Sequence, residues 1–135
     1  MQPVSPAVSH PSDQVAATIL VVDDDEVMRD LLSRMLGRAG YAVETAADGR
    51  KALESFHEHA IDAVVTDMSM PKMDGLELTR ALLTECPELP IVAVTGVDAS
   101  YLRVAIAAGA KAGMQKPIRA GELAQTMRRL LPQRA

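Results

Sequence analysis

The sequence alternates five times between a short apolar run and a longer segment whose apolar residues recur at helical spacing. Short β-branched runs bounded by turn residues predict strands, and the helical spacing predicts helices. The predicted strands cover residues 18–22, 41–45, 63–67, 91–94 and 111–115. The predicted helices cover residues 27–39, 50–59, 75–85, 99–108 and 121–131. Strands that alternate with helices form a parallel sheet, with right-handed crossovers that place helices on both of its faces. The pattern therefore predicts an α/β domain.

The chain has 135 residues, which is enough for one domain with a real core. Residues 1–16 contain Pro3, Pro6 and Pro11 and show no apolar period, so we expect a disordered N-terminal tail there. The domain then covers residues 17–132. On its first helix, Val27, Leu31 and Met35 lie on one side together with Leu32, Leu36 and Ala39, which predicts the apolar face.

Charge and composition narrow the possible partners. The net charge is −4 at pH 7 and aromatic residues make up 2% of the chain, so neither a basic surface nor base-stacking side chains point to nucleic acid. Cys86 is the single cysteine, so no intramolecular disulfide forms, and a reducing cytoplasm fits. No apolar run approaches the roughly 20 residues of a membrane span, and the N-terminus lacks the pattern of a signal peptide. We expect a cytoplasmic protein.

The third predicted strand ends abruptly in Asp67, and the helix breakers Pro71 and Gly75 follow it. A carboxylate at the carboxyl end of a buried strand is held on a rigid element and faces the crevice where open α/β sheets bind their ligands. Asp67 is therefore the first candidate for a functional residue.

Other polar side chains follow the remaining strands. Asp23 and Asp24 follow the first strand, Thr95 follows the fourth, and Lys116 follows the fifth. In a parallel sheet these ends lie along one edge, so three carboxylates would gather there and repel one another. A hard divalent cation that keeps several waters, as Mg²⁺ does, would neutralise them. A carboxylate can also act as a nucleophile towards phosphorus, giving an aspartyl phosphate. A metal, an ammonium and a hydroxyl then meet the needs of phosphoryl transfer.

Four motifs carry a resemblance to a known family. They are ILVVDDDE at 19–26, VVTDMSMPKMDGL at 64–76, VAVTG at 92–96 and GMQKP at 113–117. In this order and at these strand ends, the chain resembles the CheY-like receiver domain of response regulators in two-component signalling. The resemblance implies a flavodoxin-like (βα)5 fold, in which helices cover both faces of a five-stranded parallel sheet of order 2-1-3-4-5.

The resemblance also implies roles for individual residues. Asp67 matches the aspartate that accepts the phosphoryl group. Asp23 and Asp24 match the acidic pair that holds Mg²⁺, with Asp24 the more direct ligand and Asp23 acting largely through water. Ser69 would offer its main-chain carbonyl to the metal, so the implied metal set is Asp23, Asp24, Asp67 and Ser69.

Two further residues complete the implied site. Thr95 matches the hydroxyl that turns towards the phosphate, and Lys116 matches the lysine that pairs with Asp67 and then with the phosphoryl group. Pro117 fits the cis peptide bond that the family has at this place, which would aim Lys116.

Two positions depart from the family pattern. Gly113 stands where the family has a Tyr or Phe three residues before the lysine, the aromatic switch that is coupled to the threonine. Ile118 stands where a Phe usually follows Lys-Pro. The residues for phosphorylation therefore match the family pattern, whereas the residue of the aromatic switch is absent.

The implied function is a stand-alone switch in a two-component system or phosphorelay. A histidine kinase or histidine phosphotransfer protein would phosphorylate Asp67, and the change would bias the fourth helix and the fifth strand. The switch would catalyse its own phosphorylation and dephosphorylation without being an enzyme for an outside substrate. It would contact a downstream protein through its fourth helix, fifth strand and last helix, as a monomer or weak homodimer.

Two alternatives stay open at the level of sequence. The first is a receiver fold that binds partners independently of phosphorylation, which Gly113 favours. The second is a phosphatase of the haloacid dehalogenase type, which has an aspartyl nucleophile after its first strand; here the expected Gly-Thr after the aspartates is missing.

Several residues have a simpler structural explanation. We expect Asp25, Glu26 and Asp74 to cap or begin helices. His57 and His59 are expected to be solvated residues near a helix end rather than metal ligands. The methionines that flank Asp67 are expected to pack in the core; they are Met68, Met70 and Met73.

Overall fold

The computed structural model describes residues 16–70, 73–96 and 98–131. It contains a five-stranded, wholly parallel sheet of strand order β2-β1-β3-β4-β5. The strands are β1 (Thr18–Val22), β2 (Ala42–Ala46), β3 (Ala63–Asp67), β4 (Ile91–Thr95) and β5 (Ala112–Gln115). The helices are α1 (Glu26–Arg38), α2 (Gly49–Glu58), α3 (Gly75–Glu85), α4 (Ser100–Ala108) and α5 (Ala120–Leu130). The predicted architecture and strand order are confirmed, with element ends that differ by at most one residue. The predicted N-terminal tail lies outside the described residues, except for Ala16.

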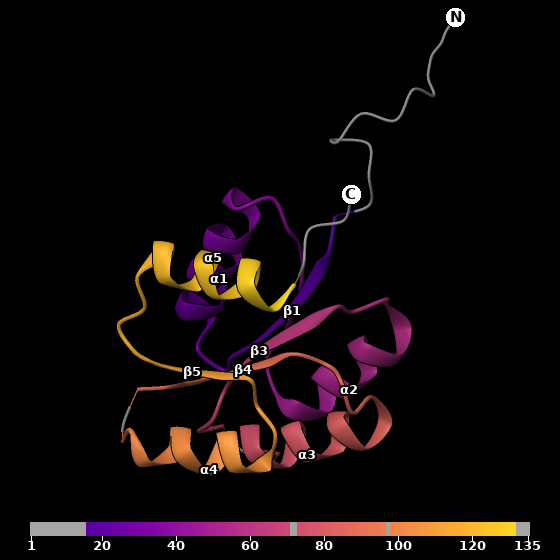
Figure 1. Cartoon of the computed structure of the whole chain (residues 1–135). Coiled ribbons are helices and arrows are strands. Elements are labelled where there is room, and N and C mark those ends of the chain that lie inside the picture. The colour runs from indigo at the N-terminus through magenta and orange to yellow at the C-terminus, as the bar shows by residue number, and fades with distance from the viewer. Residues whose placement is uncertain (1–15, 71–72, 97, 132–135) are drawn as a thin grey trace, which may run out of the picture.

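The sheet separates two layers of helices. Helices α1 and α5 cover one face, and α2, α3 and α4 cover the other (Figure 1). Strand β1 shows how the sequence builds both layers, because successive side chains of a strand point to opposite faces. Ile19 and Val21 pack in the cluster under α1 and α5, whereas Leu20 and Val22 pack in the cluster under α2 to α4. Both faces are therefore covered, and the central strands β3 and β4 are buried along their whole length.

Acidic residues begin three of the helices. The side chains of Asp25, Asp48 and Asp74 accept hydrogen bonds from main-chain N–H groups in the first turns of α1, α2 and α3. These N–H groups have no partner within the helix, so the caps stabilise the helix starts. The predicted helix-capping roles of Asp25 and Asp74 are confirmed, and Glu26 is the first residue of α1.

The predicted apolar face of α1 is partly wrong. Leu32 and Leu36 are buried, but Val27 is 76% exposed and Leu31 is 44% exposed. Successive side chains of a helix are rotated by about 100°. The side of α1 that carries Val27 and Leu31 therefore faces solvent, because the adjacent side, which carries Met28 and Leu32, faces the sheet.

Other expectations about packing hold. Met68 and Met70 are buried and Met73 packs against the same core cluster, so the methionines beside Asp67 belong to the core. His57 and His59 are exposed. Within the described residues, no helix combines the length and the apolar character that crossing a bilayer requires.

Backbone contact fixes where α3 begins relative to Asp67. A Cβ added at Gly75 would clash with the main-chain oxygen of Asp67 and would lie 2.7 Å from the Cα of Met68. The N–H of Gly75 donates to the carbonyl oxygen of Met68 at 3.3 Å. Only a residue without a side chain allows the loop after β3 to close this tightly.

We therefore expect Gly75→Ala to lower the free energy of unfolding by about 2 kcal/mol, because backbone atoms rather than flexible side chains must move. The matched control is Gly37→Ala in α1, where an added Cβ meets nothing within 4 Å. That change should raise the free energy of unfolding by about 0.5 kcal/mol through helix propensity. Urea denaturation of both variants measures the difference. Equal effects of the two substitutions would show that the contact at Gly75 is unimportant.

Candidate functional site

The carboxyl ends of four strands meet along one edge of the sheet. Asp67 and Thr95 are the last residues of β3 and β4, while Asp23 and Lys116 directly follow β1 and β5. The main chain ties the last two strands together, since the N–H of Lys116 donates to the carbonyl oxygen of Thr95 at 2.8 Å. The Lys116–Pro117 peptide bond is cis, as expected from the resemblance. Residues far apart in the sequence thus lie side by side.

Three carboxylates form a compact acidic cluster at this edge. Asp23, Asp24 and Asp67 can each offer one oxygen such that these oxygens lie within 4.8 Å of one another. Asp23 is completely buried and Asp67 is 6% exposed, whereas Asp24 is exposed to solvent. Hard oxygen donors at this spacing, open to water on one side, suit a divalent cation of the Mg²⁺ or Ca²⁺ class. The cluster therefore could hold a metal.

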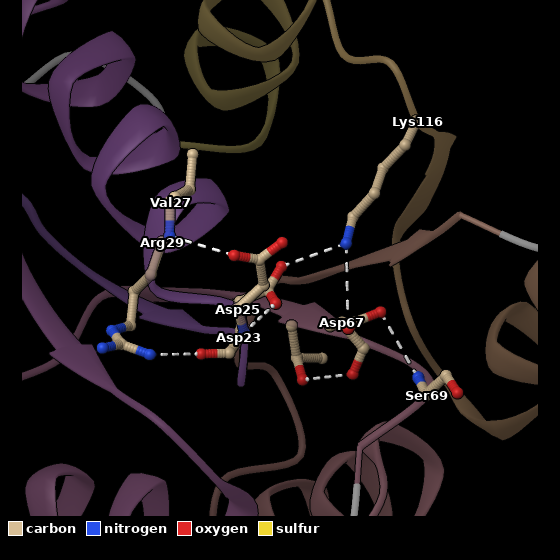
Figure 2. A network of polar contacts seen from close by, with 8 residues as sticks. Asp23, Asp25, Val27, Arg29, Asp67, Ser69 and Lys116 are labelled. Carbon is tan, nitrogen blue, oxygen red and sulfur yellow. Dashed lines mark hydrogen bonds and ion pairs between the residues drawn. The ribbon is translucent and has the colours of Figure 1, made fainter.

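Lys116 is the cation that the structure places against these acids. Its Nζ lies 3.2 Å from Oδ2 of Asp23 and 3.8 Å from Oδ2 of Asp67 (Figure 2). The expected pairing of Lys116 with Asp67 is present, but the contact with Asp23 is shorter and is the hydrogen bond. Asp23 is the most deeply buried of the acids, so its carboxylate has the greatest need of a countercharge.

Asp67 is held from two sides. The N–H of Ser69 donates to Oδ1 of Asp67 at 3.3 Å, while Oδ2 faces Lys116 (Figure 2). Burial raises the pKa of the Asp67 carboxyl above its ordinary value of 3.8, and the Asp23 carboxylate raises it further. The Lys116 ammonium and the Ser69 hydrogen bond lower this pKa, and Asp24 raises it slightly, so the net direction is upward. The site disfavours a negative charge on Asp67 in the absence of a further cation.

The loop from β1 to α1 is fixed by a residue that the sequence did not reveal. Nη1 of Arg29 donates to the main-chain oxygen of Asp23 at 2.7 Å, and the N–H of Asp25 donates to Oδ1 of Asp23 at 2.9 Å (Figure 2). Arg29 reaches back from the first turns of α1, so it orients the loop that carries Asp23 and Asp24. Its only sequence signal was a basic residue six positions after Asp23, close to the acidic cluster.

The two remaining predicted site residues also lie at this edge. Thr95 is completely buried at the end of β4. Ser69 is exposed in the loop after β3, and its described contact with Asp67 is made through its N–H group. The roles predicted for the Thr95 hydroxyl and for the Ser69 carbonyl remain predictions.

Comparison with protein families now identifies this arrangement. Residues 19–128 match the model of the response regulator receiver domain. The chain belongs to this family. Receiver domains are phosphorylation-controlled switches of two-component signalling, so the chain has this function and is not an enzyme of the usual kind. The alternative of a phosphatase of the haloacid dehalogenase type is therefore wrong.

Curated relatives extend beyond this chain. It is 46% identical over 114 residues to response regulator MprA of Mycolicibacterium vanbaalenii, covering 84% of this chain and 49% of the relative. It is 44% identical over 118 residues to MprA of Mycobacterium ulcerans, covering 87% of this chain and 51% of the relative. The chain thus spans about half the length of the curated relatives it matches.

Solved structures agree with the fold. Chemotaxis protein CheY4 of Vibrio cholerae superimposes with a TM-score of 0.79 at 34% identity, covering 86% of this chain and 99% of that one. The receiver domain of NtrX from Brucella abortus gives a TM-score of 0.80 at 34% identity, covering 84% of this chain and 97% of that one.

The raised pKa of Asp67 predicts a pH-dependent effect of Asp67→Asn. Above the folded-state pKa the wild-type protein carries a buried, repelled charge, so the substitution should increase the free energy of unfolding at neutral pH. As the pH falls through that pKa towards 3.8, wild-type Asp67 becomes neutral and the gain should shrink. Urea denaturation of the metal-free protein at several pH values measures the effect.

The matched control for this prediction is Asp30→Asn, at an exposed position on α1. It corrects for the removal of one negative charge from an acidic chain. A gain at Asp67 that persists unchanged at acid pH, or that Asp30→Asn reproduces, would show that a buried charge on Asp67 is not the cause.

Proposed function

We propose that Asp67 accepts a phosphoryl group from the phosphohistidine of a histidine kinase or phosphotransfer protein. The observation that carries this proposal is the position of the Asp67 carboxylate at the end of β3, in the acidic cluster with Asp23 and 3.8 Å from the Lys116 ammonium. In the transfer, an oxygen of Asp67 forms a bond to phosphorus while the bond between phosphorus and the histidine nitrogen breaks. The released imidazole keeps the electron pair and takes up a proton.

The residues around Asp67 prepare it for this reaction. Ser69 holds one carboxylate oxygen through its N–H, which leaves the other oxygen facing Lys116. The ammonium of Lys116 then attracts the phosphoryl oxygens, and the Thr95 hydroxyl donates to one of them. Arg29 keeps Asp23 and Asp24 in place through the main chain. Fixed charges and donors of this kind account for most catalysis of phosphoryl transfer.

The metal in this proposal is Mg²⁺. The three clustered carboxylates suit it, with Asp24 as a direct ligand, Asp23 acting largely through water, and Asp67 and the Ser69 carbonyl completing the protein donors. When bound, Mg²⁺ neutralises charge on the transferring oxygens. Burial, and then the Asp23 carboxylate, raise the pKa of Asp67, and a bound cation would favour its charged form.

The same site would remove the phosphoryl group. We propose that water attacks the aspartyl phosphate and that the domain catalyses this hydrolysis itself. The switch would act in the cytoplasm, which suits a chain with one cysteine, and would contact protein rather than nucleic acid, which suits its net charge of −4. The target would bind the face formed by α4, β5 and α5, with the domain as a monomer or weak homodimer.

Incubation with acetyl phosphate and Mg²⁺ tests the assignment of Asp67. We expect intact-mass spectrometry to show a gain of one phosphoryl group, about 80 Da, because the carboxylate forms an acyl phosphate. Asp67→Ala should give no adduct, while Asp30→Asn should behave as wild type. Chelation of Mg²⁺ should suppress the adduct.

Two results would contradict the assignment of Asp67 as the phosphoryl acceptor. An adduct that persists in Asp67→Ala would place the acceptor elsewhere. A wild-type protein that stays unmodified, while a second receiver domain is phosphorylated in the same tube, would favour an interaction module that works without phosphorylation.

The short contact between Lys116 and Asp23 predicts competition between the lysine and the metal. We expect Lys116→Met to tighten Mg²⁺ binding about tenfold, since the ammonium no longer neutralises the acids. Asp23→Asn should weaken binding about tenfold by removing one carboxylate. Isothermal titration calorimetry with magnesium chloride measures both, with Asp30→Asn as the control. Weaker binding by Lys116→Met would contradict the prediction.

A further inference from the structure

An open hollow of about 420 Å³ lies between α4 and β5, away from the acidic cluster. It is lined by Leu102, Arg103, Ile106 and Ala107 of α4 and by Gly113 of β5. Its volume falls within the range of about 300 to 1,000 Å³ that is usual for ligand sites. Its lining is mainly apolar, and Arg103 is the charged residue among these five.

Gly113 forms the β5 side of this hollow, next to Leu102. An ideal Cβ at position 113 would lie 3.2 Å from both Cβ and Cδ2 of Leu102. A side chain at this position of β5 would therefore press against Leu102 and change the shape of the hollow. The receiver family usually has an aromatic side chain at this position, whereas this chain has none and Leu102 of α4 packs close to the strand. An apolar side chain from outside can enter instead.

The surroundings of the hollow have a charge opposite to that of the chain as a whole. Residues 99–121 contain four basic residues and no acidic one; one of the four, Lys116, pairs with Asp23 in the acidic cluster, and Asp98 just before the segment interacts with Arg103. Of these four, Arg103 lines the hollow and Lys111 lies two positions before Gly113. A ligand for this surface would combine negative charge with one apolar group.

We propose that this hollow binds an acidic segment of a partner protein and that an aromatic side chain of the segment enters beside Gly113. The inference deepens the proposed function and rests on its statement that the face of α4, β5 and α5 meets a protein target. Leu102 and Ile106 contact the ring, and Arg103 pairs with an acid next to it. The partner thereby supplies the aromatic group that the β5 strand lacks.

Other occupants fit the surface less well. A nucleic acid backbone would match the basic residues but would leave the apolar lining without a contact. A second copy packed by two-fold symmetry would place the basic residues of this segment against one another. An acidic segment with an aromatic ring satisfies both the charge and the apolar surface.

A fluorescent peptide, acetyl-Asp-Glu-Phe-Glu-Asp-amide, provides the probe. Its affinity for the full chain is measured by fluorescence anisotropy, and its position by ¹⁵N chemical shifts. We expect the amides of Leu102, Ile106 and Gly113 to shift on binding. Replacing Phe by Ala in the peptide should weaken binding about tenfold, because the ring supplies the apolar contact.

The chain offers a matched pair of variants. Ile106 and Val104 are both on α4 and both 46% exposed, but only Ile106 lines the hollow. Ile106→Ser should weaken binding about tenfold, whereas Val104→Ser should change it by less than about twofold. Arg103→Gln should also weaken it. Gly113→Leu should abolish binding by filling the hollow, and the three α4 variants decide the matter if Gly113→Leu does not fold.

Several outcomes would overturn the inference. They are equal affinity for the Phe and Ala peptides, equal effects of Ile106→Ser and Val104→Ser, displacement of the peptide by duplex DNA, and a dimer in sedimentation that excludes the peptide. The acetyl phosphate experiment on the same samples separates this inference from the proposed function. Peptide binding without a phosphoryl adduct would refute the proposed phosphorylation of Asp67 but not the peptide site. An adduct without specific peptide binding would refute the peptide site but not the phosphorylation.

Discussion

Repulsion among buried carboxylates is the constraint on which the site depends. Asp23 and Asp67 are buried together at the end of the central strands, with Asp24 beside them at the surface. Such a group is costly unless cations and hydrogen-bond donors surround it. Lys116 supplies the charge, and the N–H groups of Asp25 and Ser69 supply donors. Burial, and then the Asp23 carboxylate, still raise the pKa of Asp67 despite these partners, so the site favours a ligand that brings positive charge.

The fold makes this arrangement possible by fixing its members on rigid strands. Apolar residues bury β1, β3 and β4 on both faces, so the position of each strand end is set by packing and by the parallel ladder. The backbone contact between Gly75 and Asp67 then holds the loop after β3 against the start of α3. A small change in packing under the sheet would thus move one carboxylate relative to the others.

Much of this could be predicted from the sequence, because strand ends and their polar residues are local signals. These signals predict the alternation of strands and helices. They also predict that Asp23, Asp67, Thr95 and Lys116 gather at one edge of the sheet. The partners of individual side chains were harder to predict from the sequence. The closer contact of Lys116 with Asp23 depends on three-dimensional burial, and the bond from Arg29 to the Asp23 carbonyl depends on how α1 is oriented against the loop. The same orientation decided that Val27 and Leu31 are exposed, which apolar spacing alone does not determine.

The polarity of the sheet has a practical consequence. All five strands run in one direction, and the acidic cluster of Asp23, Asp24 and Asp67 lies at their carboxyl ends. The connection from α3 to β4 lies at the opposite, amino-terminal end of the sheet. Glu88 is exposed in that connection. A dye, an affinity tag or a tether to a surface attached there would leave the chemistry undisturbed. The molecule therefore has a natural handle for immobilised or single-molecule measurements.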